Sequence, residues 1–526
     1  MRKKEWRGLI KKYSSNNYIQ LLFIIGALLP FYFVLYKIFS VRSLAFGCFD
    51  DCVNYMAGHF MIHGKELYSE IFFNHIMGMA YLSYAVQIIH PPVNLYDFVL
   101  SHRQAILIIA FLLNVLIIKR FMWAGVGFVL FYELTKFYIF GDRFLAESIV
   151  VYLAVYLSGL VMEKLNNKKL SLFDYVIAGI FSFLIMYLRE PYIPLSLFLY
   201  AVVLWGKINR PKIISFGVFT LLIGLVALNT SIPDFIFNDY TVNVQTIIKS
   251  EASSKSLLGS GIVQVFFNPI YILTGGIWSI YRVFQIGISV GFICGLVYLI
   301  KLKHFKSLVI IIIMLGLSNI RIVEPGVMYY EAYHGVVWTG MLIFITLVLV
   351  YSVFKNYKKI GIALILIITM TFGYTVFAPA SYIYDKINLQ EQLLTNFGKE
   401  MNVGNVISKL SDKNDTVFLD GADDMIIWQS KLFTPYKYSW YTSVMPQIPL
   451  YRQERITMFK NNPPDFYYDF CSKEAPLNPG MPGFIKNRYQ QLYENGKPSC
   501  LYVLKSKIPE IRSEQWKAAA EGFYTL

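Results

Sequence analysis

The sequence predicts an α-helical polytopic membrane protein of about eleven transmembrane helices, followed by a C-terminal α/β domain outside the membrane. Composition supports this class, because 56% of the 526 residues are hydrophobic and only 15% are charged, whereas about a quarter of the residues in a soluble domain are charged. A series of long apolar runs occupies the first 378 residues, and the polar remainder contains no such run.

The first apolar run, from about Ile19 to Phe39, follows a basic N-terminus and is long enough to span a bilayer as a helix. No small-residue cleavage site follows it, so we interpret it as a retained helix and not as a signal peptide. Ten further runs predict the remaining spans. They centre on residues 103–122, 123–140, 144–162, 172–188, 192–206, 213–230, 280–300, 307–322, 335–354 and 360–378.

Lysine and arginine residues give the orientation of these spans. Clusters of basic residues fall in five connections that, with the N-terminus, share one side of the membrane in the predicted topology. Basic residues are retained on the cytoplasmic side, so the N-terminus is predicted to be cytoplasmic. The clusters are Lys119/Arg120, Lys164/Lys168/Lys169, Lys207/Arg210/Lys212, Lys301/Lys303/Lys306 and Lys355/Lys358/Lys359. They also account for the net charge of +15, so we expect no nucleic-acid partner.

An odd number of spans places the C-terminus outside, in a multi-pass protein of the plasma membrane. We assign residues 1–378 to a transmembrane domain with external loops at about 40–102 and 231–275, and residues 379–526 to an external soluble domain. Within the first loop, residues 76–90 are too short for a span, and they predict an amphipathic helix at the outer interface.

The external domain is predicted to be a small α/β fold. Residues 416–421, 464–470 and 499–505 have the apolar and aromatic character of buried strands. Residues 484–495 have apolar side chains at helical spacing. The segment 379–526 therefore combines strands with at least one helix.

Four of the five cysteines fall outside the membrane in this topology. Cys471 and Cys500 flank or lie in predicted strands, so a disulfide between them is plausible. Cys48 and Cys52 are four residues apart, a spacing that on a helix is rarely ideal for a bridge. Whether either pair is bonded stays open, and no cysteine spacing indicates a zinc site.

Two adjacent carboxylates, Asp50 and Asp51, lie about ten residues beyond the first predicted span. Neighbouring carboxylates repel, so one pKa is expected to be raised, which suits a general base. The pair could equally ligate a hard divalent cation together with water. A third interpretation is an ordinary helix N-cap, and these residues alone leave all three open.

The residues that follow resemble the first external loop of GT-C-fold membrane glycosyltransferases, which use polyprenyl-phosphate-linked sugars. This superfamily includes protein mannosyltransferases, lipid A aminoarabinose transferases and rhizobial lipopolysaccharide sugar transferases. Its loop reads Asp-Glu, a Tyr and an Ala, Gly-x-x-x-Tyr, an acidic residue and Lys/His-Pro-Pro-Gly. The matching residues, in register without a gap, are Asp50, Asp51, Ala57, Gly64, Tyr68, Glu70, His75 and Gly78. Asp51 replaces the usual Glu, and Ile76 and Met77 replace the two prolines.

The resemblance implies an enzyme that moves a sugar from a polyprenyl-phosphate donor to an acceptor hydroxyl on the external face, usually with inversion. Asp50 would take the acceptor proton, and Asp51 would assist or orient it. The implied partners are the lipid-linked sugar, the lipid bilayer and an acceptor that is a glycan, a lipid or a protein. The resemblance gives no certain cofactor, and a divalent metal at Asp50 and Asp51 stays an alternative.

The departing phosphate needs cations and hydrogen-bond donors. Arg321, at the external end of a predicted span, is the candidate phosphate ligand; the alternative is an arginine that anchors an interfacial aromatic belt. Further candidates for the donor site are His75, His334 and Tyr330, and the supporting candidates are Tyr68, Glu70 and Glu331.

Glu147 lies about one turn into a predicted span, where a charge needs a function or a partner. Arg143, four residues earlier, is the expected partner, and both are kept as supporting residues of the site. Arg189 and Glu190, at the end of another span, are interpreted as a neutralised pair.

Two other classes of protein remain open. A transporter or flippase of lipid-linked sugars would place ionisable groups near the bilayer midplane, on paired and interrupted helices, whereas here these groups cluster at the external ends of spans and in loops. A polysaccharide polymerase or ligase would share the large external loops, but it would usually lack the early Asp pair and the external α/β domain.

Overall fold

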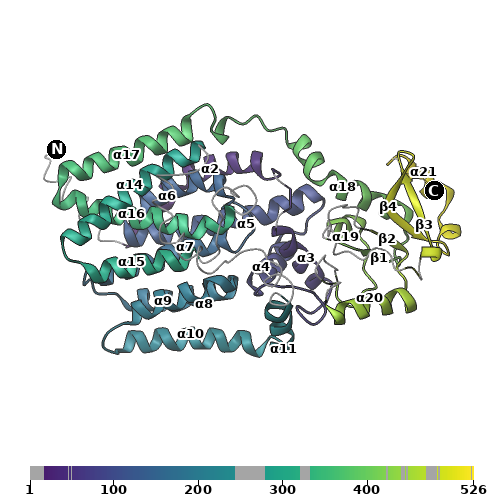
Figure 1. The fold of residues 1–526 in the computed structure, drawn as a ribbon, viewed down its shortest axis with the longest axis horizontal. Coiled ribbons are helices and arrows are strands. Elements are labelled where there is room, and N and C mark those ends of the chain that lie inside the picture. The colour runs from purple at the N-terminus through teal and green to yellow at the C-terminus, as the bar shows by residue number, and fades with distance from the viewer. Residues whose placement is uncertain are drawn as a thin grey trace. The chain divides into compact units, whose positions relative to one another are not determined.

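The computed structural model is mostly helical (Figure 1). It describes residues 17–45, 47–48, 50–242, 279–319, 332–421, 425–439, 445, 448–469, 483, 486–522 and 524–525. The chain divides into two compact units. Unit 1 comprises Met1–Arg42, Arg103–Leu228 and Ser256–Ile387, and unit 2 comprises Ser43–His102, Asn229–Lys255 and Asn388–Leu526. Residues of the predicted first external loop thus belong to the same compact unit as Asn388–Leu526.

Unit 1 is built of long apolar helices. These are α2 (Asn17–Arg42), α5 (Leu95–Phe121, whose first residues belong to unit 2), α6 (Trp123–Thr135), α7 (Glu147–Leu165), α8 (Leu172–Leu188), α9 (Ile193–Leu204), α10 (Arg210–Leu228), α14 (Ile280–Lys301), α15 (Phe305–Ser318), α16 (Val336–Asn356) and α17 (Lys358–Phe377). Short 3-10 helices are η1 (Lys136–Ile139), η2 (Glu190–Tyr192), η5 (Ala332–Gly335) and η6 (Tyr382–Tyr384). Every predicted apolar run falls on one of the long helices.

Within the described part of the chain, seven helices are long and apolar enough to cross a membrane by length and composition. They are α2, α5, α7, α10, α14, α16 and α17, while α8, α9 and α15 are shorter apolar helices. These helices are compatible with the predicted multi-pass membrane protein. The number of eleven spans and the orientation stay predictions.

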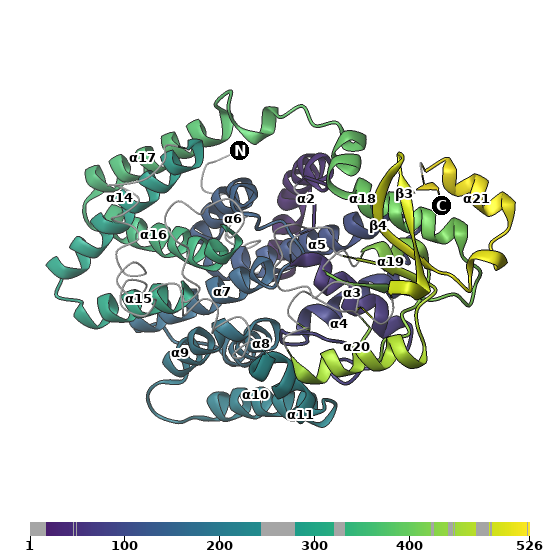
Figure 2. The same cartoon turned by 45° about the vertical axis from the view of Figure 1, so that its right-hand side comes forward.

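Helix α7 lies at the core of unit 1, and Figure 2 shows it among the helices of the bundle. It packs against α8, α9 and α16, and nearly all of its side chains are buried. The sequence of α7 has no polar face, and a helix that is apolar around its whole circumference is expected to be buried on every side.

A buried ion pair joins three of these helices to η1. The Nζ of Lys136 lies 2.7 Å from the Oε2 of Glu133, and both side chains are almost wholly buried. Tyr152 on α7 and Asn114 on α5 both donate to the Oε1 of Glu133, at 2.6 and 2.7 Å. A buried charge is tolerated when its partners satisfy it, so this cluster is a structural polar core that sequence reasoning missed.

Unit 2 combines helices with a five-stranded sheet. Its helices are α3 (Asp51–Ile62), α4 (Gly78–Ile89), α11 (Ile232–Phe235), the π-helix η3 (Ile236–Thr241), α18 (Leu389–Leu410), α19 (Met425–Ser430), α20 (Pro449–Asn461), α21 (Ser513–Ala520) and the 3-10 helices η8 (Lys486–Arg488) and η9 (Ile508–Glu510). Its strands are β1 (Val417–Leu419), β2 (Phe466–Tyr468), β3 (Tyr489–Glu494), β4 (Lys497–Leu504) and β5 (Tyr524–Thr525). The strand order is β1-β2-β4-β3-β5.

Three predicted strands are confirmed, since β1 and β2 fall within 416–421 and 464–470, and β4 overlaps 499–505 and begins two residues earlier. β1 and β2 pair in parallel and are buried on both faces, which explains their continuous apolar sequences. The short helix predicted over 76–90 is confirmed as α4. Its position at a membrane interface stays a prediction.

The helix predicted over 484–495 is wrong, because this segment contains β3. Strand β3 pairs with β4 in an antiparallel hairpin (Figure 2). The two turn residues, Asn495 and Gly496, have φ angles of 51° and 74°. An Asn-Gly pair readily adopts two consecutive positive φ angles and is a strong hairpin signal. This local signal outweighs the helical spacing of the apolar residues.

Helices α3 and α4 pack closely where Gly58 faces α4. A Cβ atom at this position would lie 2.4 Å from the Oγ of Ser83. Only glycine allows this distance between the two helices. The close packing sets the position of the segment that begins with Asp50 and Asp51.

A buried ion pair holds α20 against the sheet. The Nε of Arg455, on α20, donates to the Oδ1 of Asp420 at 3.1 Å, and its Nη2 bonds to Oδ2. Tyr467 on β2 also donates to Asp420, and burial raises the pKa of this tyrosine, so it remains a donor. Asp420 and Arg455 are 1% and 3% exposed, so each depends on the other for neutralisation.

We predict that Asp420→Ala destabilises unit 2 by about 3–5 kcal/mol, since it leaves the buried Arg455 charge without this carboxylate. Thermal unfolding of the purified full-length protein measures the effect. Asp412→Ala is the matched control, because Asp412 is half exposed and lies 3.6 Å from Lys507. This variant should lose no more than about 1 kcal/mol of stability. Equal losses for the two variants would contradict the prediction.

Candidate functional site

The first candidate residue, Asp50, occupies the N-cap position of α3. Its side chain makes no capping hydrogen bond, and the residue is half-buried. Asp50 therefore occupies the N-cap position, as one interpretation predicted, but its carboxylate does not cap the helix. The carboxylate lies at the end of the helix where the backbone N–H groups point, and this end favours negative charge.

Asp51 has a different environment from its neighbour. It is fully buried, and the hydroxyl of Tyr55, one turn later on α3, donates to its Oδ2 at 2.8 Å. The ring of Tyr55 in turn contacts Phe98 and His102. Of the two adjacent residues, Asp50 is thus half-buried, whereas Asp51 is fixed inside the unit by its bond to Tyr55.

A disulfide joins Cys48 to Cys52 and so brackets the two aspartates. The Cα atoms are 5.5 Å apart, within the range for a bridge. Cys52 is in the first turn of α3, whereas Cys48 precedes the helix. The two cysteines are therefore not both on a helix, and the unfavourable geometry of a four-residue spacing on a helix does not apply to them. Cys500 is also disulfide-bonded; its predicted partner, Cys471, lies outside the described residues.

A buried polar network supports α3 from behind. The Nδ1 of His102 lies 2.7 Å from the carbonyl oxygen of Phe98, and its Nε2 lies 2.8 Å from the Oγ of Ser83. Because a carbonyl can only accept, Nδ1 carries the proton and Nε2 accepts from Ser83. Gln87 donates to the carbonyl of Tyr55 at 2.9 Å. These bonds fix α3 to α4 and to the first residues of α5.

Three further candidates, Tyr68, Glu70 and His75, lie together in the loop between α3 and α4. The Tyr68 hydroxyl donates to the carbonyl oxygen of His75 at 2.8 Å. Glu70 accepts a hydrogen bond from the backbone N–H of Glu66 at 3.0 Å. Tyr68 is buried and has a φ of 72°. A bulky residue adopts this backbone conformation only where the surroundings enforce it.

Asn238 is one source of that constraint. It lies in the predicted second external loop and is 1% exposed. Its Nδ2 donates to the carbonyl oxygen of Tyr68 at 3.0 Å, and its Oδ1 accepts from the hydroxyl of Tyr451, on α20, at 3.0 Å. One amide therefore joins the first loop, the second loop and the C-terminal domain.

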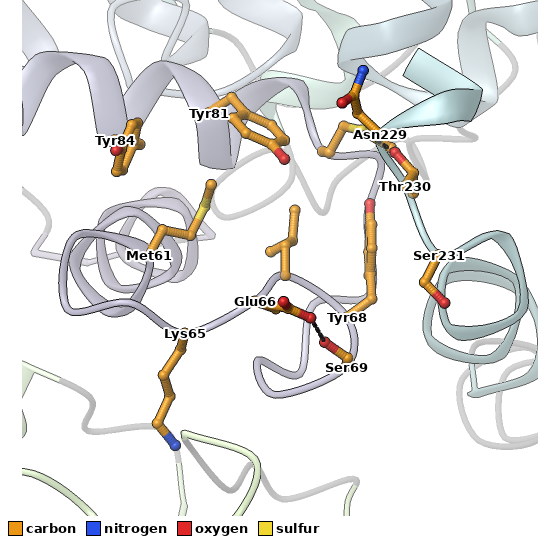
Figure 3. A pocket seen from close by; sticks show the side chains of 12 residues that line it. Met61, Lys65, Glu66, Tyr68, Ser69, Tyr81, Tyr84, Asn229, Thr230 and Ser231 are labelled. Atoms are coloured by element: carbon orange, nitrogen blue, oxygen red, sulfur yellow. Dashed lines mark hydrogen bonds between the residues drawn. The ribbon is translucent and has the colours of Figure 1, made fainter. Parts of the chain in front are cut away.

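The loop that contains Tyr68 lines two cavities, of about 420 and 350 Å³. Both are lined by Glu66, Tyr68 and Ser69. Figure 3 shows the larger one, which lies between the loop, α4 and the segment Asn229–Ser231. The smaller cavity is lined further by Asp234 and by residues of the C-terminal domain.

The remaining candidates belong to unit 1 or lie outside the described residues. His334, in η5, is buried, and its carbonyl oxygen accepts from Tyr192 at 3.5 Å. Arg321, Tyr330 and Glu331 lie outside the described residues. The described candidates thus form one group in unit 2, from Asp50 to His75, and a second group in unit 1 that includes His334.

Glu147 pairs with Arg189, whose Nε lies 3.3 Å from its Oε1. The sequence had instead indicated pairs of Glu147 with Arg143 and of Arg189 with Glu190. Glu147 begins α7 and Arg189 follows the last residue of α8. These two helices pack together and are joined by a short connection, so the start of one lies beside the end of the other. The Nε of Arg143 lies 3.9 Å from Asp142.

Among the residues that the structure describes, no group of three or more histidine, cysteine or acidic side chains could hold a metal ion. Asp51 already accepts a hydrogen bond from Tyr55. A cation bound at Asp50 and Asp51 would therefore depend mainly on water for its ligands.

Comparison with known proteins assigns this chain to no family. No protein-family model matches the sequence, and no curated protein sequence is significantly similar to it. The function that the resemblance of residues 50–78 to the GT-C loop implies is therefore a proposal.

Three residues of the site carry no clear sequence signal. Asn238, Tyr451 and His102 stand in segments far apart in the sequence, and only the folded unit brings Asn238 to Tyr68 and Tyr451. The nearest signal is compositional, since Asn238 and Asp239 interrupt an aromatic stretch, and a polar residue in such a stretch must find partners when it is buried.

We predict that Asn238→Ala lowers the free energy of unfolding of unit 2 by about 2–4 kcal/mol. The change removes the partner of two buried groups, each of which costs about 1–3 kcal/mol when unsatisfied. Thermal unfolding of the full-length protein provides the measurement. Asn405→Ala is the control, because Asn405 is exposed and its Oδ1 accepts from the half-buried side chain of Gln429 at 2.6 Å. A loss no larger than that of the control would show that Asn238 does not join the three segments.

Proposed function

We propose that this protein is an integral-membrane glycosyltransferase that moves a sugar from a polyprenyl-phosphate donor to an acceptor hydroxyl on the external face of the membrane. The observation that carries the proposal is the position of Asp50 at the start of α3. It heads α3 without capping that helix, and the rest of the motif, Tyr68, Glu70 and His75, folds into the same unit.

Asp50 is the proposed general base. It accepts the proton of the acceptor hydroxyl while that oxygen bonds to the anomeric carbon of the sugar. The bond between this carbon and the phosphate oxygen breaks, and the electron pair leaves with the polyprenyl phosphate. A base must be ionised before the reaction, and the N-terminus of α3 favours the ionised carboxylate.

Asp51 is a positioning residue in this proposal. Its bond to Tyr55 fixes the first turn of α3, and the Cys48–Cys52 disulfide fixes the chain just before it. Precise placement of a base contributes strongly to catalysis, because small displacements cost large factors in rate. The two constraints therefore act on the direction of the Asp50 carboxylate.

Two further observations support the proposal. The apolar helices of unit 1 are suited to hold the polyprenyl tail, which supplies binding energy away from the reacting atoms. Disulfides form in oxidising compartments, so the bridge at Cys48–Cys52 favours the external side for unit 2. Arg321, His75, His334 and Tyr330 remain the proposed ligands of the donor phosphate.

We predict that Asp50→Asn lowers sugar transfer by at least about 100-fold, the range of general-base catalysis. Transfer is measured in membranes with a radiolabelled polyprenyl-phosphate sugar, normalised to the amount of inserted protein. Asp97→Asn is the matched control, because Asp97 is an acidic residue of the same unit that pairs with the exposed His90. Full activity of Asp50→Asn would show that another group is the base.

The disulfide gives a second prediction. The double variant Cys48→Ser/Cys52→Ser should lose about 2 kcal/mol of stability, as expected for a short ring. At temperatures well below unfolding, it should also lose about tenfold in kcat with little change in the KM for the donor, because only the direction of the base changes.

Two controls separate positioning from stability. Cys294→Ser removes the unbonded cysteine on α14 and should leave kcat unchanged. Treatment with a reductant should lower the kcat of the wild type more than that of the double variant, since both also contain the disulfide bond of Cys500. A double variant with the kcat of the wild type would rule out a positioning role for the bridge.

A further inference from the structure

The larger cavity of unit 2 has no part in the chemistry assigned to Asp50. Figure 3 shows its walls: the end of α3 with Met61, the loop that carries Glu66 and Tyr68, helix α4, and the segment from Asn229 to Ser231. With about 420 Å³, it has the size of a small-ligand site. All of its lining residues belong to unit 2.

One wall of the cavity is aromatic. Tyr81 and Tyr84 stand three residues apart on α4, so they share one face of that helix. In Figure 3 both rings border the cavity opposite the loop, and the hydroxyl of Tyr81 points into it. Tyr81 is 39% exposed, so a ligand can reach its ring. Tyrosines offer an apolar face together with a hydrogen-bonding hydroxyl.

The opposite wall carries small polar groups. The Oγ of Ser69 donates to the Oε2 of Glu66 at 3.1 Å, which orients this carboxylate at the cavity (Figure 3). Thr230 and Ser231 line the third side. Carboxylates and hydroxyls accept and donate hydrogen bonds in the pattern that a polyhydroxylated ligand requires.

The charges at the cavity disfavour an anion. Lys65 is the one basic residue among the described residues of its lining, and its ammonium group donates to the carbonyl oxygens of Tyr436 and Lys437 at 3.4 and 3.2 Å. Figure 3 shows the Lys65 side chain directed away from the other lining groups. Burial lowers the pKa of Lys65, whereas the carboxylate of Glu66 repels negative charge. A phosphate group is therefore a poor ligand here.

The cavity is also too far from Asp50 to hold the reacting hydroxyl. Asp50 precedes the first residue of α3, and Met61 is near its end. Eleven residues of α-helix separate the two positions by about 17 Å. A molecule that occupies the cavity and also reaches Asp50 must be an extended chain.

We propose that this cavity is a remote binding site for a neutral oligosaccharide, and that the acceptor of the transferase is consequently a glycan chain. Only the statement about the acceptor rests on the proposed function, because saccharide binding can be measured without transfer. Tyr81 and Tyr84 stack on sugar rings, and Glu66 and the hydroxyls on the opposite wall bind the sugar hydroxyl groups.

Binding is tested with the full-length Asp50→Asn protein in lauryldimethylamine oxide, a detergent without a sugar headgroup. The probes are tetrasaccharides of glucose, mannose, galactose and N-acetylglucosamine, together with inorganic phosphate, measured by isothermal titration calorimetry. We expect at least one tetrasaccharide to bind. Tyr81→Ala and Tyr84→Ala should each weaken this binding by at least about tenfold, which corresponds to the loss of one good contact.

Tyr240→Ala is the matched control, because Tyr240 is 68% exposed, belongs to unit 2 and lines neither cavity. The Tyr240→Ala variant should bind the tetrasaccharide with the same affinity as the parent Asp50→Asn protein. Binding of phosphate alone, no binding of any tetrasaccharide, or equal affinities for the Tyr81, Tyr84 and Tyr240 variants would each overturn the inference.

The outcomes also separate this inference from the proposed function. If Asp50→Asn retains full transfer activity but the tetrasaccharide binds through Tyr81, the assignment of the base fails and the saccharide site stands. If Asp50→Asn is inactive but no tetrasaccharide binds, the transferase stands and the saccharide site fails. In the active protein, Tyr81→Ala should raise the KM for a glycan acceptor by at least about tenfold and change kcat less.

Discussion

The amide of Asn238 is the interaction on which unit 2 depends. This side chain is 1% exposed, so its donor and acceptor must both be satisfied inside the protein. They are satisfied by Tyr68 of the first loop and by Tyr451 of the C-terminal domain. The two bonds join three segments far apart in the sequence, so this one side chain links their positions in the unit.

This constraint extends to the candidate site. Tyr68 keeps its left-handed conformation where Asn238 holds its carbonyl oxygen, and the loop beyond it then places His75 against the Tyr68 hydroxyl. On the other side of the loop, α3 is fixed to α4 through Gly58 and carries the two aspartates at its start. The residues that match the motif are therefore positioned by packing and not by spacing alone.

The sequence predicts what depends on local pattern. Apolar runs marked every long helix of unit 1, and continuous apolar segments marked β1, β2 and β4. It failed where two local signals competed, as at β3, whose Asn495-Gly496 turn opposed a helical spacing. It also failed where the partner is distant in sequence: the pair of Glu147 and Arg189 arises from the packing of α7 against α8, which no spacing within one helix can indicate.

The carboxylates of the protein show why Asp50 differs from the rest. Glu133 and Asp420 are buried, and each is neutralised by a cation that the fold supplies. Asp51 is buried with a hydroxyl donor. Such partners stabilise a buried carboxylate. Asp50 is only half-buried and caps no helix, and its backbone is constrained instead by a disulfide and by the adjacent Asp51. Constraint through the backbone fixes the position from which the Asp50 carboxylate extends, and a general base must be placed within hydrogen-bond reach of the proton that it accepts.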